Sequence, residues 1–387
     1  MGPLTGLRII EVASLGAGPF CGMMLADMGA EIVRVDRVTG PRSSAAHSPN
    51  DPLLRSRKSI SLDLSQPGGV EILLELAGTA DALFEGFRPG VTERLGFGPE
   101  VCLQQNPKLV YGRMTGWGQD GPLSRAAGHD INYIALSGAL HAIGRPGEKP
   151  VVPLNLVGDF GGGGMLLAFG LVCALFETRQ SGKGQVVDAA MLDGSLAQMA
   201  MSFGMLANRQ FPLEPGSSLM SGIAPFYDTY ETADGKYVAL GSVEPPFFRQ
   251  LLELTGIPFE EFGDAGFTSL SGGMNTEKWP ELKNRLAAAF KTRSREEWCS
   301  IMEGTDACFA PVLTLAEIQD HDHIQYRQSV INIDGVIQNA PAPRFSRTIA
   351  DTPAPPCRNG QHTDQLLEEL GRNPAEIKAL RQNGIAS

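Results

Sequence analysis

The first half of the chain alternates short apolar runs with segments whose apolar residues recur at helical spacing. Residues 7–12 and 31–35 are β-branched apolar runs, and residues 20–28 between them have helical spacing and end at Gly29. A strand, a helix and a second strand of these lengths predict a parallel βαβ unit with a right-handed crossover. Similar apolar runs predict further strands at 60–64, 82–85 and 109–114. The N-terminal part is therefore predicted to be a doubly wound α/β domain.

The pattern changes in the middle of the chain. An apolar run that ends at Val157 predicts a strand, and the glycine-rich segment 158–164 leads into a helix from about Met165. A short strand is predicted at 185–189, before a long, methionine-rich helix at 192–209. Methionine is flexible and fills irregular gaps, so we interpret these methionines as core or interface packing.

A second pattern begins after Pro215. Two alternating runs flank Asp234-Gly235, which predicts a β-hairpin, and helical, charge-rich segments follow to about Glu303. The tail predicts two short helices, at 363–370 and 374–381. We therefore expect a large Rossmann-like domain (1–186 and 321–387), a connecting helix and linker (187–223), and a smaller α+β domain with a return linker (224–320).

Composition and charge narrow the function classes. The 387 residues carry a net charge of −11, which argues against nucleic acid as the main partner. The N-terminus lacks a basic segment followed by an apolar one, and the longest apolar run, 165–176, is shorter than the roughly 20 residues that cross a bilayer. The six cysteines are scattered without a C-x-x-C pair, which predicts reduced thiols and no bound metal. We expect a cytoplasmic protein that does not bind a membrane.

The loop after the first strand has two features of a nucleotide site. Gly16-Ala17-Gly18 follows the strand, and Asp36 ends the next one. The glycine spacing and Pro19 do not match the nicotinamide-binding motif, and Arg37 beside the acid suits a phosphate better than a ribose. Two interpretations stay open, a tight turn without a ligand and a site for a nucleotide with extra phosphates.

Further arginines stand near the ends of the predicted strands. Arg57, Arg88 and Arg94 could converge with Arg37 on one phosphate-rich ligand, because guanidinium groups bind phosphate oxygens in pairs. The alternative is that each is an ordinary solvated surface arginine.

Three polar residues are candidates for proton chemistry. His129 and Asp130 stand where a helix begins, in the segment GHDINY, and Asp159 precedes four glycines. Asp130 and Asp159 are each also explained as helix caps, and a lone histidine is often structural. Burial of Asp159 in a partly apolar wall would raise its pKa and make it a better base. Glu244 is fixed by two following prolines, although an exposed loop glutamate has the same pattern.

Several segments together resemble one family. These are GHDINY, PLNLVGDFGGG, GKGQVVDAAMLDG, APFYDTY, VEPPF, TDAC with the PVL that follows it, and PAPRFSRT. They are similar to the alpha-methylacyl-CoA racemases of the family III CoA-transferase superfamily, from about Leu4 to Arg347. The segment SSLMSGIAPF (217–226) departs from the pattern, since an aspartate and two glycines usually stand where Ser221, Gly222 and Ile223 are found. The acyl preference is therefore open.

The resemblance implies inversion of the 2-methyl centre of branched acyl-CoA thioesters. His129 would take the α-proton from the (S) substrate and Asp159 from the (R) substrate, on opposite faces of an enolate. Glu244 would orient His129. We expect the backbone amide of Asp130, helped by Asn155, to stabilise the enolate oxygen.

The resemblance also implies how coenzyme A is bound and how subunits associate. No metal or redox cofactor is expected, since coenzyme A is part of the substrate. The family forms an interlocked homodimer, in which Glu244 would come from the partner. The implied CoA contacts are Arg37, Arg88 and Arg94 for phosphates, the backbones of Leu62 and Leu64 for adenine, and Leu15, Asp130 and Tyr133 along the pantetheine arm.

Three rival functions remain at this stage. A family III CoA-transferase would use Asp159 as a nucleophile that forms an acyl anhydride, and it would not need a histidine at position 129. A non-catalytic CoA-ester binding protein would need neither residue for turnover. A dehydrogenase would depend on the nicotinamide site that the first loop matches poorly.

Overall fold

The computed structural model describes residues 2–38, 50–269 and 273–387. The chain forms two compact units. The first comprises Met1–Ser137, Leu154–Gln198 and Asp322–Ser387, and the second comprises Gly138–Pro153 and Met199–His321. This grouping divides the predicted connector 187–223 between the two units and assigns residues 138–153 to the second unit. The domain boundaries expected from the sequence stay a prediction.

A six-stranded parallel sheet is the centre of the first unit. Its order is β3-β2-β1-β4-β5-β6, and the order reverses between β1 and β4. This is the predicted doubly wound arrangement, which binds ligands where the strand order reverses, at the carboxyl ends of the strands. The strands are β1 (Arg8–Val12), β2 (Glu31–Arg37), β3 (Arg57–Leu62), β4 (Ala82–Glu85), β5 (Val110–Thr115) and β6 (Gln185–Ala190).

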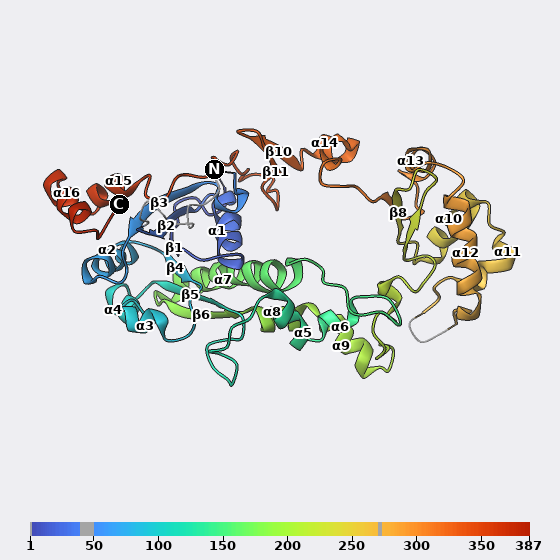
Figure 1. Ribbon diagram of the computed structural model, residues 1–387, viewed down its shortest axis with the longest axis horizontal. Coiled ribbons are helices and arrows are strands. Elements are labelled where there is room, and N and C mark those ends of the chain that lie inside the picture. Colours follow the sequence, from blue (N-terminus) through green and yellow to red (C-terminus); the bar gives the residue numbers. More distant parts are fainter. Residues whose placement is uncertain (1, 39–49, 270–272) are drawn as a thin grey trace. The chain divides into compact units, whose positions relative to one another are not determined.

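Both faces of this sheet are covered by helices (Figure 1). Successive strand residues point to opposite faces, so Ile9 packs in one core and Ile10 in the other. One face carries α1 (Ala17–Asp27) and α7 (Leu166–Ser181). The other carries α2 (Pro67–Gly78), α4 (Pro99–Gln105), α15 (Thr363–Glu369) and α16 (Pro374–Gln382), and the short helix α3 (Val91–Leu95) precedes α4.

The segment before α7 differs from its prediction. The strand expected before Asp159 is wrong, because Leu156–Met165 forms a π-helix, η2, that continues directly into α7. Its glycines allow close helix packing, since a Cβ on Gly162 would lie 2.8 Å from the backbone nitrogen of Ser195 in α8 (Met191–Gln198). The glycine run therefore brings helices together beside Asp159.

The methionine-rich segment is two helices where the sequence predicted one. It divides into α8 and α9 (Ala200–Ala207), with the break at Met199. The two helices belong to different units. Helical periodicity continues across the break, so the apolar pattern alone does not reveal it.

The C-terminal segment returns to the first unit. The hairpin of β10 (Val330–Ile333) and β11 (Val336–Asn339) follows α14 (Asp322–Arg327). The last residues then pair with the outer edge of β3, where Asp63 donates its backbone N–H to Ile385 at 2.9 Å. Asn373 caps α16 as predicted, because its side chain accepts from the N–H groups of Ala375 and Glu376.

The second unit is a smaller α+β unit. Its antiparallel sheet has the order β7-β8-β9, and the predicted Asp234-Gly235 hairpin joins β7 to β8. Aromatic side chains such as Phe226, Phe290 and Trp298 fill its core. Its main elements are α6 (Ala139–Ala142), β7 (Thr229–Glu231), β8 (Tyr237–Leu240), α10 (Pro245–Thr255), α11 (Phe259–Phe262), α12 (Trp279–Phe290), α13 (Arg295–Met302) and β9 (Phe309–Pro311).

One described helix is long and apolar enough to cross a membrane. It is the continuous stretch Leu156–Ser181, with a mean hydropathy of 1.7. Leu167, Leu171 and Leu175 from this stretch pack in the core against the sheet. A core helix of this kind meets the same length and composition test, so the feature is weak evidence for a membrane span.

Candidate active site

A cavity of about 710 Å³ opens at the carboxyl ends of the strands in the first unit. The loops after β1, β4 and β5 and the carboxyl end of β2 form its walls, together with the start of α5 (Asp130–Leu136) and part of η2. This is the position where a doubly wound sheet binds ligands. Residues singled out from the sequence line it, namely Leu15, Gly16, Asp36, Arg37, Arg88, His129, Tyr133 and Asp159.

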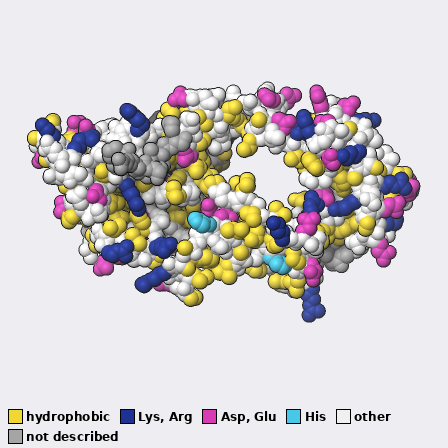
Figure 2. Space-filling model, in the orientation of Figure 1, with side chains coloured by type: hydrophobic (Ala, Val, Ile, Leu, Met, Phe, Trp, Pro, Cys, Tyr) yellow, Lys and Arg dark blue, Asp and Glu magenta, His cyan; other side chains and the backbone are white. Residues whose placement is uncertain are grey.

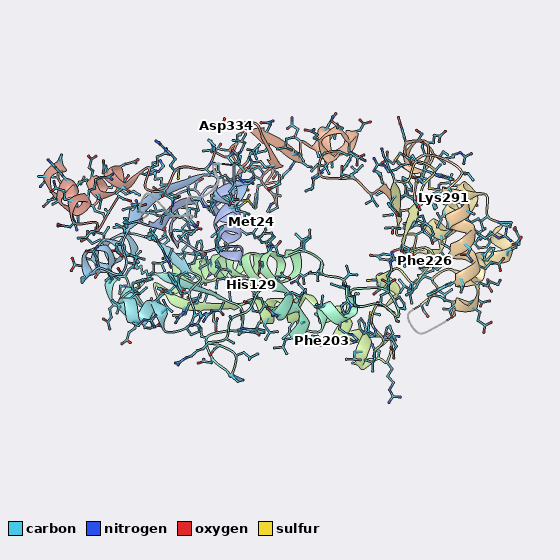
Figure 3. The ribbon with its side chains drawn as sticks, in the orientation of Figure 1. Met24, His129, Phe203, Phe226, Lys291 and Asp334 are labelled. Carbon is cyan, nitrogen blue, oxygen red and sulfur yellow. The ribbon has the colours of Figure 1, made fainter. Side chains whose placement is uncertain are left out.

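His129 is the N-cap residue of α5 (Figure 3). Its backbone N–H donates to Asn132 Oδ1 at 3.0 Å, so the asparagine three residues later fixes the start of the helix. The side chain is exposed at the cavity. The ring is therefore accessible to a ligand in the cavity.

Asp159 lies in the first turn of η2. Its Oδ2 accepts a hydrogen bond from Asn155 Nδ2 at 3.2 Å. Partial burial, together with the negative charge of Asp130, raises the pKa of Asp159, while the Asn155 hydrogen bond and the nearby His129 oppose that shift. A carboxylate with a raised pKa is a better proton acceptor, which is the property that the sequence predicted for this residue.

The first loop approaches Asp159 closely. Gly16 is the N-cap of α1 with φ +64°, and a Cβ on it would lie 3.3 Å from Asp159 Oδ2. Backbone in this left-handed region favours glycine. Gly16 therefore lines the cavity directly beside the candidate base.

Asp130 is buried, with 6% of its surface exposed. Its Oδ2 accepts from the backbone N–H groups of Gly158 and Asp159, both at 2.7 Å. Its own backbone N–H, the predicted enolate donor, has no acceptor among the described residues. Asn155, predicted as a second enolate donor, directs its amide to Asp159.

The predicted CoA contacts divide into two groups. Leu15, Arg37 and Arg88 are exposed side chains in the cavity lining. The described lining does not include Leu62, Leu64 or Arg94. Leu62 and Leu64 pack with the core, and Arg94 is exposed on α3, so their contacts to adenine and phosphate stay predictions.

Arg34, Arg57 and Asp36 form buried ion pairs with one another and with Glu11. Arg34 contacts Glu11 and donates to Asp36 Oδ1 at 3.0 Å, and Arg57 Nε lies 3.1 Å from Glu11 Oε2. Ser59 Oγ donates to Asp36 Oδ2 at 2.6 Å. The carboxylate of Asp36 is thus occupied by protein groups, which disfavours the ribose contact of a nicotinamide site.

Trp117 and Asn359 are among the cavity residues that the sequence analysis missed. Trp117 packs edge to face on Tyr133 at 4.7 Å between ring centroids, and its buried Nε1 has no partner among the described residues. Asn359 reaches the lining from the C-terminal segment. Trp117 stands two residues beyond β5, which is a signal that could have indicated it, whereas nothing in the local sequence marks Asn359.

Glu244 belongs to the second unit. It is the N-cap residue of α10 and is followed by Pro245 and Pro246, so its backbone is held as expected. Its side chain is exposed. Among the described residues, no group of three or more His, Cys, Asp or Glu side chains is arranged to hold a metal ion.

Comparison with known proteins places the whole chain in one family. The model of CoA-transferase family III matches residues 4–363. Alpha-methylacyl-CoA racemase of Mus musculus is 43% identical over 387 residues, and that of Homo sapiens is 41% identical, each match covering 99% of this chain and 97% of the relative. Succinyl-CoA:glutarate CoA-transferase of Mus musculus is 28% identical over 100% of this chain and 90% of that protein.

Solved structures give the same result. The crystal structure of Rv3272 from M. tuberculosis aligns with a TM-score of 0.74 and 27% identity over 94% of this chain and 98% of that one. A CAIB/BAIF family protein from Brucella suis shares the fold with a TM-score of 0.79, over 95% of this chain and 99% of that one. The chain belongs to CoA-transferase family III.

Proposed function

We propose that this protein is an alpha-methylacyl-CoA racemase, which interconverts the (R) and (S) forms of 2-methylacyl-CoA thioesters. The observation that carries the proposal is that His129 and Asp159, two groups able to carry a proton, line one cavity in the first unit. The racemase relatives are more than 40% identical over nearly the whole chain, which supports the same reaction here.

The reaction breaks the C2–H bond and forms it again on the other face of C2. His129 takes the proton from the (S) substrate, and the electron pair moves into the thioester to give a planar enolate. Asp159 then returns a proton to the opposite face, and the two residues exchange roles in the reverse direction. Burial is the main cause of the raised pKa of Asp159, and the shift is toward neutral pH, where a group that both gives and takes a proton works best.

The enolate oxygen needs hydrogen-bond donors. The backbone N–H of Asp130 is proposed as that donor, since it belongs to the first turn of α5 and has no acceptor among the described residues. Asn155 acts through Asp159, because its amide donates to the carboxylate. Coenzyme A is carried as part of the substrate, and no metal or redox cofactor takes part.

The phosphates of coenzyme A are proposed to bind Arg37 and Arg88, with Leu15 and Tyr133 along the pantetheine arm. Guanidinium groups suit this role because they donate two parallel hydrogen bonds to a phosphate. The cavity volume of about 710 Å³ is in the range of small-molecule sites. A cytoplasmic location is part of the same proposal.

An interlocked homodimer is proposed as the active assembly. Met165, Phe169, Val172 and Phe176 form an exposed apolar stripe along η2 and α7, at helical spacing. Hydrophobic side chains gather in this region in Figure 2. An exposed apolar stripe of this kind suits burial against a second copy, and Glu244 of that copy would orient His129.

The alternative is a CoA-transferase, in which Asp159 attacks the thioester. The imidazole of His129 in the same cavity as Asp159 favours the racemase, because a transferase needs no second proton carrier.

Incubation of each enantiomer in D₂O, without any added carboxylic acid, distinguishes a racemase from a CoA-transferase. A racemase inverts the substrate and incorporates deuterium at C2. The proposal fails if C2 stays protiated and coenzyme A moves only when a second acid is supplied. His129→Ala is expected to lose 10²- to 10⁴-fold in turnover while it still binds the thioester, which excludes a purely binding role.

A further inference from the structure

The carboxylate of Asp130 joins the two helices that carry the candidate bases. Asp130 directly follows His129 at the start of α5, and its Oδ2 accepts from the backbone N–H groups of Gly158 and Asp159, each at 2.7 Å. One of these N–H groups is that of the candidate base itself. The carboxylate is buried, and its Oδ1 has no partner among the described residues.

The structure explains why these N–H groups need an acceptor. The first hydrogen bond of the π-helix η2 runs from Phe160 N–H to the Asn155 carbonyl. The N–H groups of η2 before Phe160 therefore have no carbonyl partner within the helix. Asp130 accepts from two of them with a charged group, and hydrogen bonds to a charged acceptor are about twice as strong as neutral ones. A side chain of α5 therefore caps η2.

The contact is too close for any residue other than glycine at position 158. A Cβ on Gly158 would lie 2.6 Å from Asp130 Oδ2 and 3.2 Å from Asp130 Cα. The start of η2 and the start of α5 are therefore in direct contact, and a larger residue at position 158 would push them apart.

We propose that Asp130 is a positioning residue, whose carboxylate holds Asp159 through its backbone at a fixed separation from His129. This inference rests on the proposed function. It assigns the side chain of Asp130 a role separate from that of its backbone amide. The negative charge of Asp130 also adds to the effect of burial in raising the pKa of Asp159.

The contributions of His129 and Asp159 can be measured separately in one experiment. In D₂O, His129 removes the proton of the (S) substrate and can return deuterium to the same face, which gives exchange with retention. Inversion of the same substrate needs Asp159 to deliver a deuteron on the other face. The ratio of inversion to exchange for the (S) substrate therefore reports how well Asp159 is positioned relative to His129.

Two variants test the contact from its two sides. Asp130→Asn keeps the shape and one acceptor oxygen but removes the charge, and Gly158→Ala inserts a methyl group into the contact. Asp193→Asn, an exposed carboxylate at the start of α8, is the matched control. We expect both test variants to lower the inversion-to-exchange ratio for the (S) substrate at least tenfold, and the control to keep the wild-type ratio.

The inversion rate and the exchange rate are measured on the same enzyme sample, so unfolded protein lowers both rates equally and leaves their ratio unchanged. The inference is overturned if Asp130→Asn and Gly158→Ala lose inversion and exchange in equal proportion, or lose neither. If the wild-type protein itself neither exchanges nor inverts, the proposed function fails.

Discussion

The side-chain amide of Asn155 lies 3.2 Å from Asp159 Oδ2 and donates a hydrogen bond to it. This bond stabilises the carboxylate and opposes the effect of burial, which raises the pKa of Asp159. Burial and the charge of Asp130 thus raise the pKa of the candidate base, while the Asn155 donor and His129 lower it. The balance between them sets the pH at which Asp159 accepts a proton.

Replacement of Asn155 should move the pH profile of one direction of the reaction. Asn155→Ala removes the donor and Asn155→Asp adds a second negative charge, so the pKa of Asp159 should increase from wild type to Ala to Asp. The base must be ionised to act on the (R) substrate, so kcat/KM for that substrate should rise at successively higher pH in the same order. On the acid limb of the profile, where Asp159 is mostly protonated, we expect Asn155→Ala to be about fivefold slower than the wild type, equivalent to one hydrogen bond of about 1 kcal/mol. The role assigned to Asn155 is wrong if the three profiles coincide.

Asn359 should contribute to binding the nucleotide end of coenzyme A. It lines the cavity with Arg37 but is not part of the machinery around His129 and Asp159. Asn359→Ala should raise KM for 2-methylacyl-CoA about fivefold, the equivalent of one lost hydrogen bond, with kcat unchanged.

Truncated substrates give the control for Asn359. The variant should treat 2-methylacyl-pantetheine, which lacks the nucleotide, as the wild type does. Asn383→Ala, in the same C-terminal segment but outside the cavity lining, should leave both KM values unchanged. An equal effect of Asn359→Ala on both substrates would contradict a nucleotide contact.

Glu85 should make the stability of the fold depend on pH. It is 1% exposed at the end of β4, and burial raises the pKa of Glu85 to about 7 although Arg113 lies 3.3 Å away. The folded chain therefore prefers the protonated form. The stability that protonated Glu85 contributes is fully present below the pKa that Glu85 has in the unfolded chain, and it is lost as the pH rises through about 7.

Denaturant unfolding at pH 5 and pH 8 measures this effect. Glu85→Gln resembles the protonated acid, so the variant should lose less stability between these pH values than the wild type, by about 3 kcal/mol. Glu93 is the contrast: burial acts against the shift, but hydrogen bonds from Arg113 lower the pKa of Glu93, so the stability it contributes is lost only at pH values below its unfolded pKa. Glu93→Gln should therefore leave the difference between pH 5 and pH 8 nearly unchanged. An identical pH dependence in wild type and Glu85→Gln would show that Glu85 is ionised in the fold throughout.

Mixed dimers should reveal which chain supplies Glu244. His129→Ala and Glu244→Ala subunits should each be poorly active alone. If Glu244 acts across the dimer, a random mixture restores about one quarter of the wild-type sites, because half of the dimers are mixed and one of their two sites is intact. No recovery after co-expression would mean that Glu244 acts within its own chain or not at all.

Regular apolar patterns predicted much of the first unit. The strand 82–85 is found as Ala82–Glu85, and the tail helices begin at Thr363 and Pro374 as expected. These elements depend on local signals, namely short apolar runs, an asparagine cap and a proline in the first turn. The α/β class and the sheet at the centre of the fold follow from such signals alone.

The segment around Asp159 could not be predicted in this way. Its π-helix is capped by Asp130, 28 residues earlier in the chain, and its glycines contact α8, which follows it. The same limit applies to Asn359, which the C-terminal segment brings to the cavity from the far end of the chain. Side chains that act through distant partners have no signature in the local sequence.

The most direct measurement is a crystal structure of the protein with a bound 2-methylacyl-CoA or a non-reactive analogue. The account predicts that C2 lies between a ring nitrogen of His129 and a carboxylate oxygen of Asp159, one on each face and each within about 3.5 Å. Both groups on the same face of C2, or either one beyond reach of its proton, would contradict it.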